Sequence, residues 1–295
     1  MKNTILLILV FVMNSCYKQE TLVDKSKLNG YDYRLYQSTP AWTLAKAIKA
    51  EDIEKIKEEV LQKKVPIDLA DPKYGSTLLR IAIYNKHYNS VKTLLELGAD
   101  PNKHDSFNGA TPVLAAAKSS DPRYLQLLLV YKGDPNSREY FSDANSTQDE
   151  ARETALTSCI TSMDGYHDLE KVKMLVEAGA DINYSKRGII QSVFGQAILS
   201  GKMDVALYLI EKEVDYTKPI AYPMLEGVIE EVSVLSILRS TVIELDTEQY
   251  KNKMKLVAFL KTKGLDYDKE PIDRTTIERI RAMYPNNWKE YINRF

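Results

Sequence analysis

The sequence predicts an all-α solenoid, in which pairs of helices stack along one axis and loops project between the pairs. The first reason is an internal period, because Thr77 and Thr111 are 34 residues apart, and so are Ala82 and Ala116. The second is an apolar i, i+3, i+4 stripe before a recurring glycine-containing ending, which is typical of a helix packed on one face. The third is a globular composition, with 44% hydrophobic and 27% charged residues. A period of this length indicates a repeat array.

The first fifteen residues are predicted to be a signal peptide. Lys2 is followed by an apolar run of nine residues, 5–13. This run is too short to cross a membrane, which takes roughly 20 apolar residues, whereas a short apolar core after a basic start is typical of a signal peptide. Cys16 follows the small Ser15, as in the lipobox of bacterial lipoproteins. An ordinary signal peptide with an incidental cysteine is the alternative.

The lipobox resemblance implies that Cys16 is lipidated and becomes the mature N-terminus. It places the protein in a bacterial envelope, held on the membrane by its lipid. The next residue is Tyr17 rather than Asp, which by resemblance to lipoprotein sorting favours the outer membrane, on its periplasmic face or at the cell surface. Residues 16–40 are polar with no sustained period, so we expect a tether between the lipid and the folded domain.

Residues 41–268 carry strings that resemble ankyrin repeats. G-S-T-L-L-R-I-A begins at Gly75 and G-A-T-P-V-L-A-A at Gly109, near the ankyrin T-P-L-H-x-A start. Endings similar to G-A-D-x-N close at Asn102, Asn136 and Asn183. The resemblance implies an ankyrin-repeat solenoid of about six helix-turn-helix units with projecting finger loops, the terminal units being degenerate. The units start near Trp42, Thr77, Thr111, Thr154, Ser192 and Ser233.

The markers of each unit have physical reasons. The hydroxyls at the unit starts can cap a first helix, and Gly98 and Gly179 follow second helices where a left-handed residue is needed. A small residue recurs where neighbouring inner helices approach, so Cys159 is expected to be a core residue rather than a nucleophile. The members of this small position are Ala82, Ala116, Cys159 and Ala197. The histidine of the ankyrin start is replaced by Arg80, Leu114, Thr157, Gly195 and Ser236.

Departures from the period predict enlarged loops and a cap. From Asn102 to Thr111 there are nine residues, but from Asn136 to Thr154 there are eighteen. A further extension is expected at 217–233, with insertions inside helix pairs near 162–167 and 239–252. Residues 269–295 contain two short helical stretches, near 275–283 and 287–293. They are predicted to form a helical C-terminal cap, because the last unit would otherwise expose its apolar face.

The sequence contains few signals of chemistry. Its three histidines, His87, His104 and His167, have no metal-ligand spacing, and no G-x-S-x-G motif is present. Residues 195–202 depart from a phosphate-binding loop in both length and composition. A formal charge of -1 provides no overall attraction to nucleic acid. We therefore expect no enzyme activity, no metal, no cofactor and no nucleic-acid partner.

Aromatic and cationic side chains outside the core markers are the candidates for partner binding. In ankyrin arrays the fingers and first helices line the concave binding face, and aromatic and Arg side chains make good interface anchors. The candidates are Tyr84, Asn85, His104, Phe107, Arg138, Tyr140, Phe141, Tyr184, Lys186 and Arg187. For Tyr140 and Phe141, the alternative is that both rings fold back onto their own finger.

These observations predict a lipid-anchored, monomeric module that binds another protein stoichiometrically and without chemistry. A narrower hypothesis is an immunity or inhibitor protein that blocks a toxin or enzyme. A scaffold of the envelope or a stress-related adaptor is the main alternative. Binding of lipid or polysaccharide, or hydrolysis supported by the acidic cluster at 149–153, are further alternatives from other classes.

Overall fold

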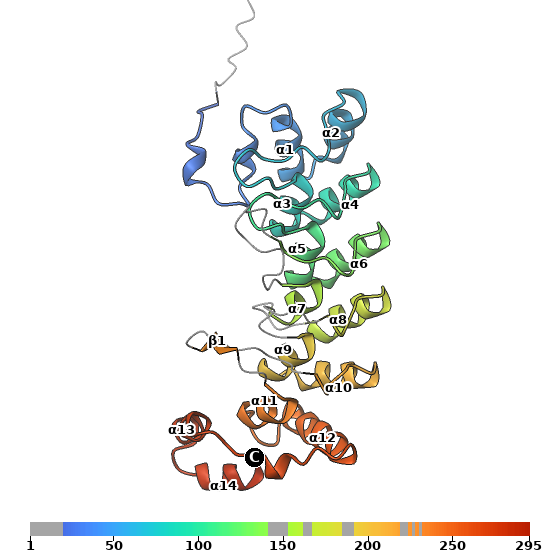
Figure 1. Cartoon of the computed structure of the whole chain (residues 1–295). Helices are drawn as coiled ribbons and strands as arrows, with labels where there is room; N and C mark the ends of the chain where they lie inside the picture. Colours follow the sequence, from blue (N-terminus) through green and yellow to red (C-terminus); the bar gives the residue numbers. More distant parts are fainter. Residues whose placement is uncertain are drawn as a thin grey trace, which may run out of the picture.

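The computed structural model describes residues 20–140, 153–161, 167–184, 192–218, 224–225, 228–229 and 232–295. Helix pairs stack in one direction, which confirms the all-α solenoid (Figure 1). The first helices of the pairs are α1 (Trp42–Lys49), α3 (Leu78–Tyr84), α5 (Pro112–Lys118), α7 (Ala155–Ile160), α9 (Val193–Leu199) and α11 (Val234–Ser240). The second helices are α2 (Ile53–Lys57), α4 (Tyr88–Glu96), α6 (Pro122–Val130), α8 (Asp168–Glu177), α10 (Met203–Glu211) and α12 (Glu248–Thr262).

The two kinds of helix form two columns in Figure 1, and the loops between pairs project from the side of the first helices. We number the helix pairs as units 1 to 6 and name each finger by the units it joins. Finger 1–2 is residues 63–76 and finger 2–3 is residues 98–110. Of finger 3–4 the structure describes residues 133–140 and 153, and of finger 4–5 it describes residues 179–184. Between units 5 and 6, β1 (Met224–Leu225) pairs with β2 (Val228–Ile229) in an antiparallel hairpin. This hairpin lies within the extension predicted at 217–233.

Hydroxyl caps start the first helices of units 2 to 6. The Thr77 hydroxyl accepts a hydrogen bond from the Arg80 backbone N–H, and Thr111 accepts one from Leu114. Thr154, Ser192 and Ser233 act in the same way. Each cap satisfies an N–H group that the helix itself leaves without a partner. The predicted register of the repeat is confirmed.

The small position of the repeat lies at the centre of the stack. Ala82, Ala116, Cys159 and Ala197 are all fully buried. Burial raises the pKa of the Cys159 thiol to about 12, so the thiolate is disfavoured. The prediction that Cys159 is a core residue is confirmed.

Side-chain hydrogen bonds link the bases of successive fingers. Asn102 Oδ1 accepts from the Asp134 N–H at 2.7 Å, and Asn136 Oδ1 accepts from the Asp181 N–H at 2.8 Å. Asp68 and Asn183 do the same for the Asp100 and Asp215 N–H groups. This ladder connects the units through the residues that close each repeat, whereas the usual histidine of the start is absent.

The N-terminal segment is packed against the array. It contains the 3-10 helices η1 (Lys25–Lys27) and η2 (Tyr33–Tyr36), and Leu35 is fully buried. The buried Tyr36 hydroxyl lies 2.8 and 2.7 Å from the carbonyl oxygens of Leu69 and Ser76. The tether predicted over 16–40 is therefore wrong for the described residues 20–40. The aromatic anchors of this segment follow neither a helical nor a strand period, so hydrophobic periodicity did not reveal them.

The C-terminal end is covered by α13 (Arg274–Met283) and α14 (Trp288–Arg294), which correspond to the two predicted helical stretches. Ile280, Tyr291 and Phe295 form a second small core there. Before it, the 3-10 helix η4 (Tyr267–Lys269) follows α12. In Figure 1 the N-terminal segment and α13–α14 both lie on the finger side, so they bound the finger surface at its two ends.

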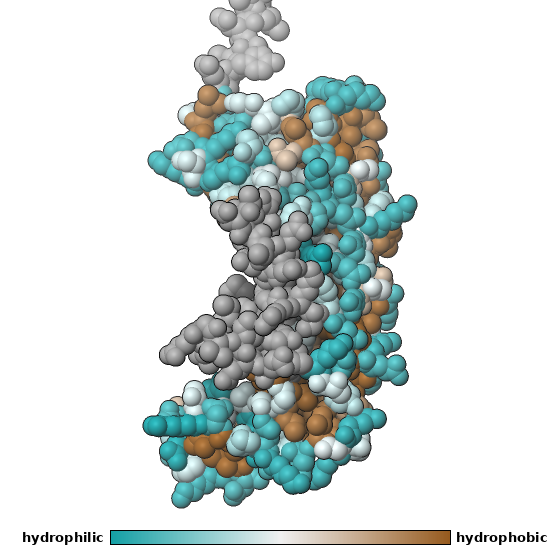
Figure 2. Space-filling model, in the orientation of Figure 1, coloured by the Kyte–Doolittle hydropathy of each residue, from teal (hydrophilic) through white to brown (hydrophobic). Residues whose placement is uncertain are grey.

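The surface in Figure 2 is mainly hydrophilic over the described residues, with separate hydrophobic patches near both ends and beside the second helices. None of the helices in the described ranges combines the length and the apolar composition that a membrane crossing requires.

Candidate partner-binding surface

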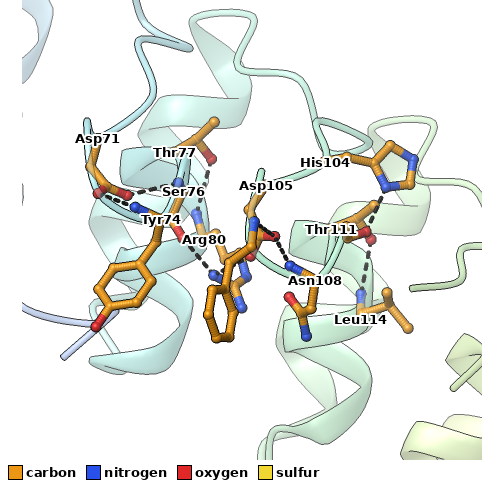
Figure 3. A network of polar contacts seen from close by, with 12 residues as sticks. Asp71, Tyr74, Ser76, Thr77, Arg80, His104, Asp105, Asn108, Thr111 and Leu114 are labelled. Atoms are coloured by element: carbon orange, nitrogen blue, oxygen red, sulfur yellow. Dashed lines mark hydrogen bonds and ion pairs between the residues drawn. The ribbon is translucent and has the colours of Figure 1, made fainter. Parts of the chain in front are cut away.

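Finger 2–3 is braced by a buried ion pair. The Arg80 Nη1 of α3 lies 2.9 Å from Asp105 Oδ2, and only 9% and 1% of the two side chains are exposed. Arg80 Nη1 also donates to Ser76 Oγ at 2.6 Å. Figure 3 shows Arg80 between the residues of the two neighbouring fingers, where it faces Asp105. The residue that replaces the repeat histidine thus ties the helix to the loop in front of it.

The Asp105 carboxylate also fixes the tip of finger 2–3. Its Oδ1 accepts from the backbone N–H groups of Phe107 and Asn108, at 3.1 and 3.0 Å. Phe107 then projects outward with 64% of its surface exposed. The Phe107 and Tyr74 rings form an edge-to-face pair, with centroids 5.5 Å apart. An exposed aromatic ring on a rigid loop is typical of an interface anchor.

Finger 1–2 repeats this design 34 residues earlier. Asp71 Oδ1 accepts from the N–H groups of Lys73 and Tyr74, and its Oδ2 accepts from the Ser76 N–H at 2.7 Å. The Asp71 carboxylate therefore closes the loop by accepting hydrogen bonds from the backbone of the same loop. Tyr74, which the sequence analysis did not single out, is positioned by this turn beside Phe107.

Finger 3–4 contacts finger 2–3 through Tyr140. The Tyr140 ring lies 4.4 Å from the His104 ring, and its N–H donates to Asn108 O at 3.1 Å. Gly109 permits this approach, because it has a positive φ of 67° and an added Cβ would lie 2.2 Å from the Tyr140 carbonyl oxygen. Tyr140 keeps 44% of its surface exposed. Thus it both packs on the neighbouring finger and remains accessible.

A surface charge cluster supports finger 3–4. The Lys118 ammonium, at the end of α5, pairs with Glu139 at 3.4 Å and with Glu153. Glu139 also accepts from Asn108 Nδ2 at 3.0 Å. Burial opposes the charge of Lys118, but the hydrogen bond to Glu153 and the charge of Glu139 outweigh it and raise the pKa of Lys118 above its ordinary value.

Fingers 3–4 and 4–5 are joined by Arg138 and Tyr184. Arg138 Nη1 donates to the Tyr184 hydroxyl at 2.8 Å, and the guanidinium carbon lies 5.5 Å from the centre of the ring. A pocket of about 280 Å³ opens beside them, with Asn136, Leu156 and Asp181 also in its wall. These contacts bring together two candidates that are 46 residues apart in sequence.

Two other candidates contact the N-terminal segment. The Tyr84 ring packs against the Tyr31 ring at a tilt of 37°, with centroids 4.2 Å apart, and Asn85 Nδ2 donates to the Tyr31 carbonyl oxygen at 2.8 Å. Tyr31 is 44% exposed, so it presents a ring on the surface next to Tyr84. The sequence analysis missed Tyr31, although three tyrosines within residues 31–36 were a signal that this segment packs.

Several predicted residues lie outside the described part of the chain. They are Cys16, Phe141, Lys186 and Arg187. We call the surface formed by Tyr31, Tyr74, His104, Phe107, Arg138, Tyr140 and Tyr184 the finger face. Within the described residues, no group of three or more His, Cys, Asp or Glu side chains is arranged to hold a metal ion.

Comparison with known proteins agrees with the repeat fold. The family model of the ankyrin repeat matches residues 74–106, which run from finger 1–2 through α3 and α4 into finger 2–3. A fowlpox virus ankyrin repeat protein is 26% identical over 117 residues, which are 40% of this chain and 23% of that protein. The ankyrin repeat and KH domain-containing protein mask-1 of Caenorhabditis elegans is 25% identical over 53% of this chain and 6% of its own.

The inactive serine/threonine-protein kinase TEX14 of Mus musculus is 38% identical over 77 residues, which are 26% of this chain and 5% of that protein. The chain thus matches less than a quarter of the length of each of these relatives. The family match over residues 74–106 and the stacked helix pairs together show the class of fold, an all-α solenoid of the ankyrin-repeat type. Arrays of this class are protein–protein interaction modules, which bind along the surface that stacking creates.

Proposed function

We propose that the protein binds another protein stoichiometrically, as a monomer and without catalysis, through the finger face. The observation that carries this proposal is the exposure of Phe107 and Tyr140 on braced fingers. An exposed ring on a mobile loop loses conformational entropy when a partner binds it. Here the contacts of Asp105 and the close approach at Gly109 already hold both loops in position. A pre-ordered aromatic surface lowers the entropic cost of association.

The test compares two sets of exposed apolar residues. The double variant Phe107→Ala with Tyr140→Ala removes the rings of the finger face, whereas Val130→Ala removes a side chain that is 73% exposed at the end of α6. A partner is first identified by cross-linking in native envelope fractions, and its affinity for each purified full-length variant is then measured by calorimetry. We expect the double variant to weaken binding by about 30-fold or more, as for interface hot spots. Equal affinities of both variants would reject the finger face.

We further propose that the protein is a bacterial lipoprotein anchored through Cys16. The support is the basic start, the apolar run at 5–13 and the small residue before the cysteine. Glu20 contacts Lys46 of α1 at 2.6 Å. Four residues span at most about 14 Å, so a lipid at Cys16 holds unit 1 close to the membrane surface. Cys16→Ser should abolish labelling by radioactive palmitate, and labelling that persists would contradict the anchor.

Within this proposal, an inhibitor or immunity role is distinguished from a scaffold by the partner's activity. The enlarged finger 3–4 and the exported location favour a specific partner outside the cytoplasm. If the identified partner is an enzyme or toxin, an inhibitor lowers its activity in proportion to the fraction in the 1:1 complex. A scaffold or adaptor leaves that activity unchanged at saturation.

A further inference from the structure

The pocket between fingers 3–4 and 4–5 contains unused hydrogen-bond donors. Its wall includes Arg138, Tyr184, Asn136, Thr154, Leu156 and Asp181. At about 280 Å³ it lies just below the usual range of small-molecule sites, so it suits one inserted side chain. Arg138 is exposed and makes no ion pair with any described residue.

The polar side chains of the pocket differ in how many of their hydrogen-bonding atoms already have partners. Both polar atoms of the Asn136 amide already have a partner, because its Oδ1 accepts from the Asp181 N–H and its Nδ2 donates one hydrogen to the Gly179 carbonyl oxygen. Thr154 Oγ1 accepts from Thr157 N–H as the cap of α7. Arg138 uses only Nη1, toward the Tyr184 oxygen, so Nε and Nη2 are without acceptors among the described residues. Since the Tyr184 oxygen accepts this bond, its own proton remains available to donate.

We propose that this pocket binds the side-chain carboxylate of a glutamate presented by the partner protein. The guanidinium supplies a planar pair of N–H donors that matches a carboxylate, and the Tyr184 hydroxyl supplies a third donor. Leu156, Pro135 and the face of Tyr184 provide apolar wall for the methylene groups that glutamate carries. This inference rests on the proposed function, because it specifies one chemical feature of the partner.

Among the described residues that line the pocket, Asp181 is the one acidic group, and it provides an internal control. Its Oδ1 accepts from the Asn183 N–H at 2.9 Å, so the carboxylate closes a local turn. Its negative charge opposes the entry of a second carboxylate. Asn at position 181 can accept the same backbone hydrogen bond without the charge. Asp181→Asn should therefore strengthen glutamate binding, which a pocket for a basic side chain would not show.

The experiment uses a defined probe and does not require the natural partner. N-acetyl-L-glutamate N-methylamide is titrated into the full chain labelled with 15N-arginine, and the side-chain resonance of Arg138 is followed by NMR. The matched probe is N-acetyl-L-glutamine N-methylamide, which has the same shape without the charge. We expect a saturable shift with a dissociation constant of about 1–10 mM, typical of a ligand of this size. The glutamine probe should bind about fivefold more weakly or worse, because it lacks charge-assisted hydrogen bonds.

The variants complete the test. Arg138→Gln should abolish binding and Asp181→Asn should tighten it about twofold to threefold. Arg123→Gln is the matched control, because Arg123 is an exposed arginine that already pairs with Asp121 at 2.6 Å. Equal binding of the two probes, unchanged binding in Arg138→Gln, or no shift of the Arg138 resonance would each overturn the inference.

Failure of this inference is separable from failure of the proposed function. If the glutamate probe binds but loss of Phe107 and Tyr140 does not weaken the partner, the pocket stands and the finger face fails. If the probe does not bind but those variants weaken the partner, the finger face stands and the partner places no carboxylate in this pocket.

Discussion

Fingers 2–3 and 3–4 are successive loops of the array. An acidic residue at the same repeat position holds each finger, but through different contacts. Asp105 and Glu139 are 34 residues apart, and both accept a hydrogen bond within the finger layer. The Asp105 side chain is 1% exposed and pairs with Arg80 from the helix behind it, whereas the Glu139 side chain is 18% exposed and pairs with Lys118, which is 33% exposed. One finger is braced by a buried charge and the other by a surface cluster.

The difference originates in one residue of the first helix. Arg80 and Leu114 are equivalent in the repeat, and both are buried. Because Leu114 carries no charge, a buried carboxylate in front of it would be unpaired, which is costly. The acid of finger 3–4, Glu139, is only partly buried and has its counter-ion, Lys118, at the end of α5. Neighbouring repeats thus keep a loop in the same position while different side-chain contacts hold it there.

The largest expected effect is from breaking the buried pair. Asp105→Ala leaves the Arg80 guanidinium buried without a counter-ion and removes the acceptor of two backbone N–H groups. We expect the free energy of unfolding to fall by about 3–5 kcal/mol, measured by urea denaturation followed by circular dichroism.

The double variant Arg80→Leu with Asp105→Asn is the control for this prediction. It gives unit 2 the leucine that unit 3 already has and keeps an acceptor for the turn. Because the uncompensated charge is gone, much of the lost stability should return. If Asp105→Ala costs less than about 1 kcal/mol, the two fingers do not differ in the way proposed.

The second-largest expected effect tests whether the first helices of units 2 and 3, α3 and α5, are packed equally tightly. Ala82→Leu and Ala116→Leu each add bulk at a fully buried position between neighbouring first helices. Overpacking of this kind costs about 1–3 kcal/mol, and the two costs should be similar. Ala50→Leu, at an exposed helix end, should change the unfolding midpoint little. Clearly unequal costs at Ala82 and Ala116 would show that the units differ in their core as well as in their fingers.

The smallest effect is expected from the surface cluster. Lys118→Ala removes the counter-ion of Glu139 and Glu153, but this site is partly solvated, so the loss should be below about 1 kcal/mol. Since the folded-state pKa of Lys118 is raised, its contribution is complete below its ordinary pKa of 10.5 and disappears as the pH rises through the folded value. Added salt should also reduce the difference from wild type. A loss as large as that of Asp105→Ala would remove the contrast between the fingers.

The sequence predicted the features that recur in every unit. The hydroxyl caps, the small buried position and the left-handed Gly98 and Gly179 are local requirements of helix starts, close packing and helix ends. Because these local requirements recur in each repeat, they can be recognised in a single sequence. The two short C-terminal helices were also predicted, close to their observed bounds.

Contacts outside the period were decided by the tertiary structure. The segment at 20–40 was predicted to be a tether, yet Tyr36 is anchored to backbone groups 33 and 40 residues away. The Arg80–Asp105 pair and the Arg138–Tyr184 bridge likewise join residues of different units, each once along the chain. Sequence reasoning placed Arg138 and Tyr184 on fingers but could not pair them. Such a contact depends on the distance between two loops, which only the stacking of the helices behind them determines.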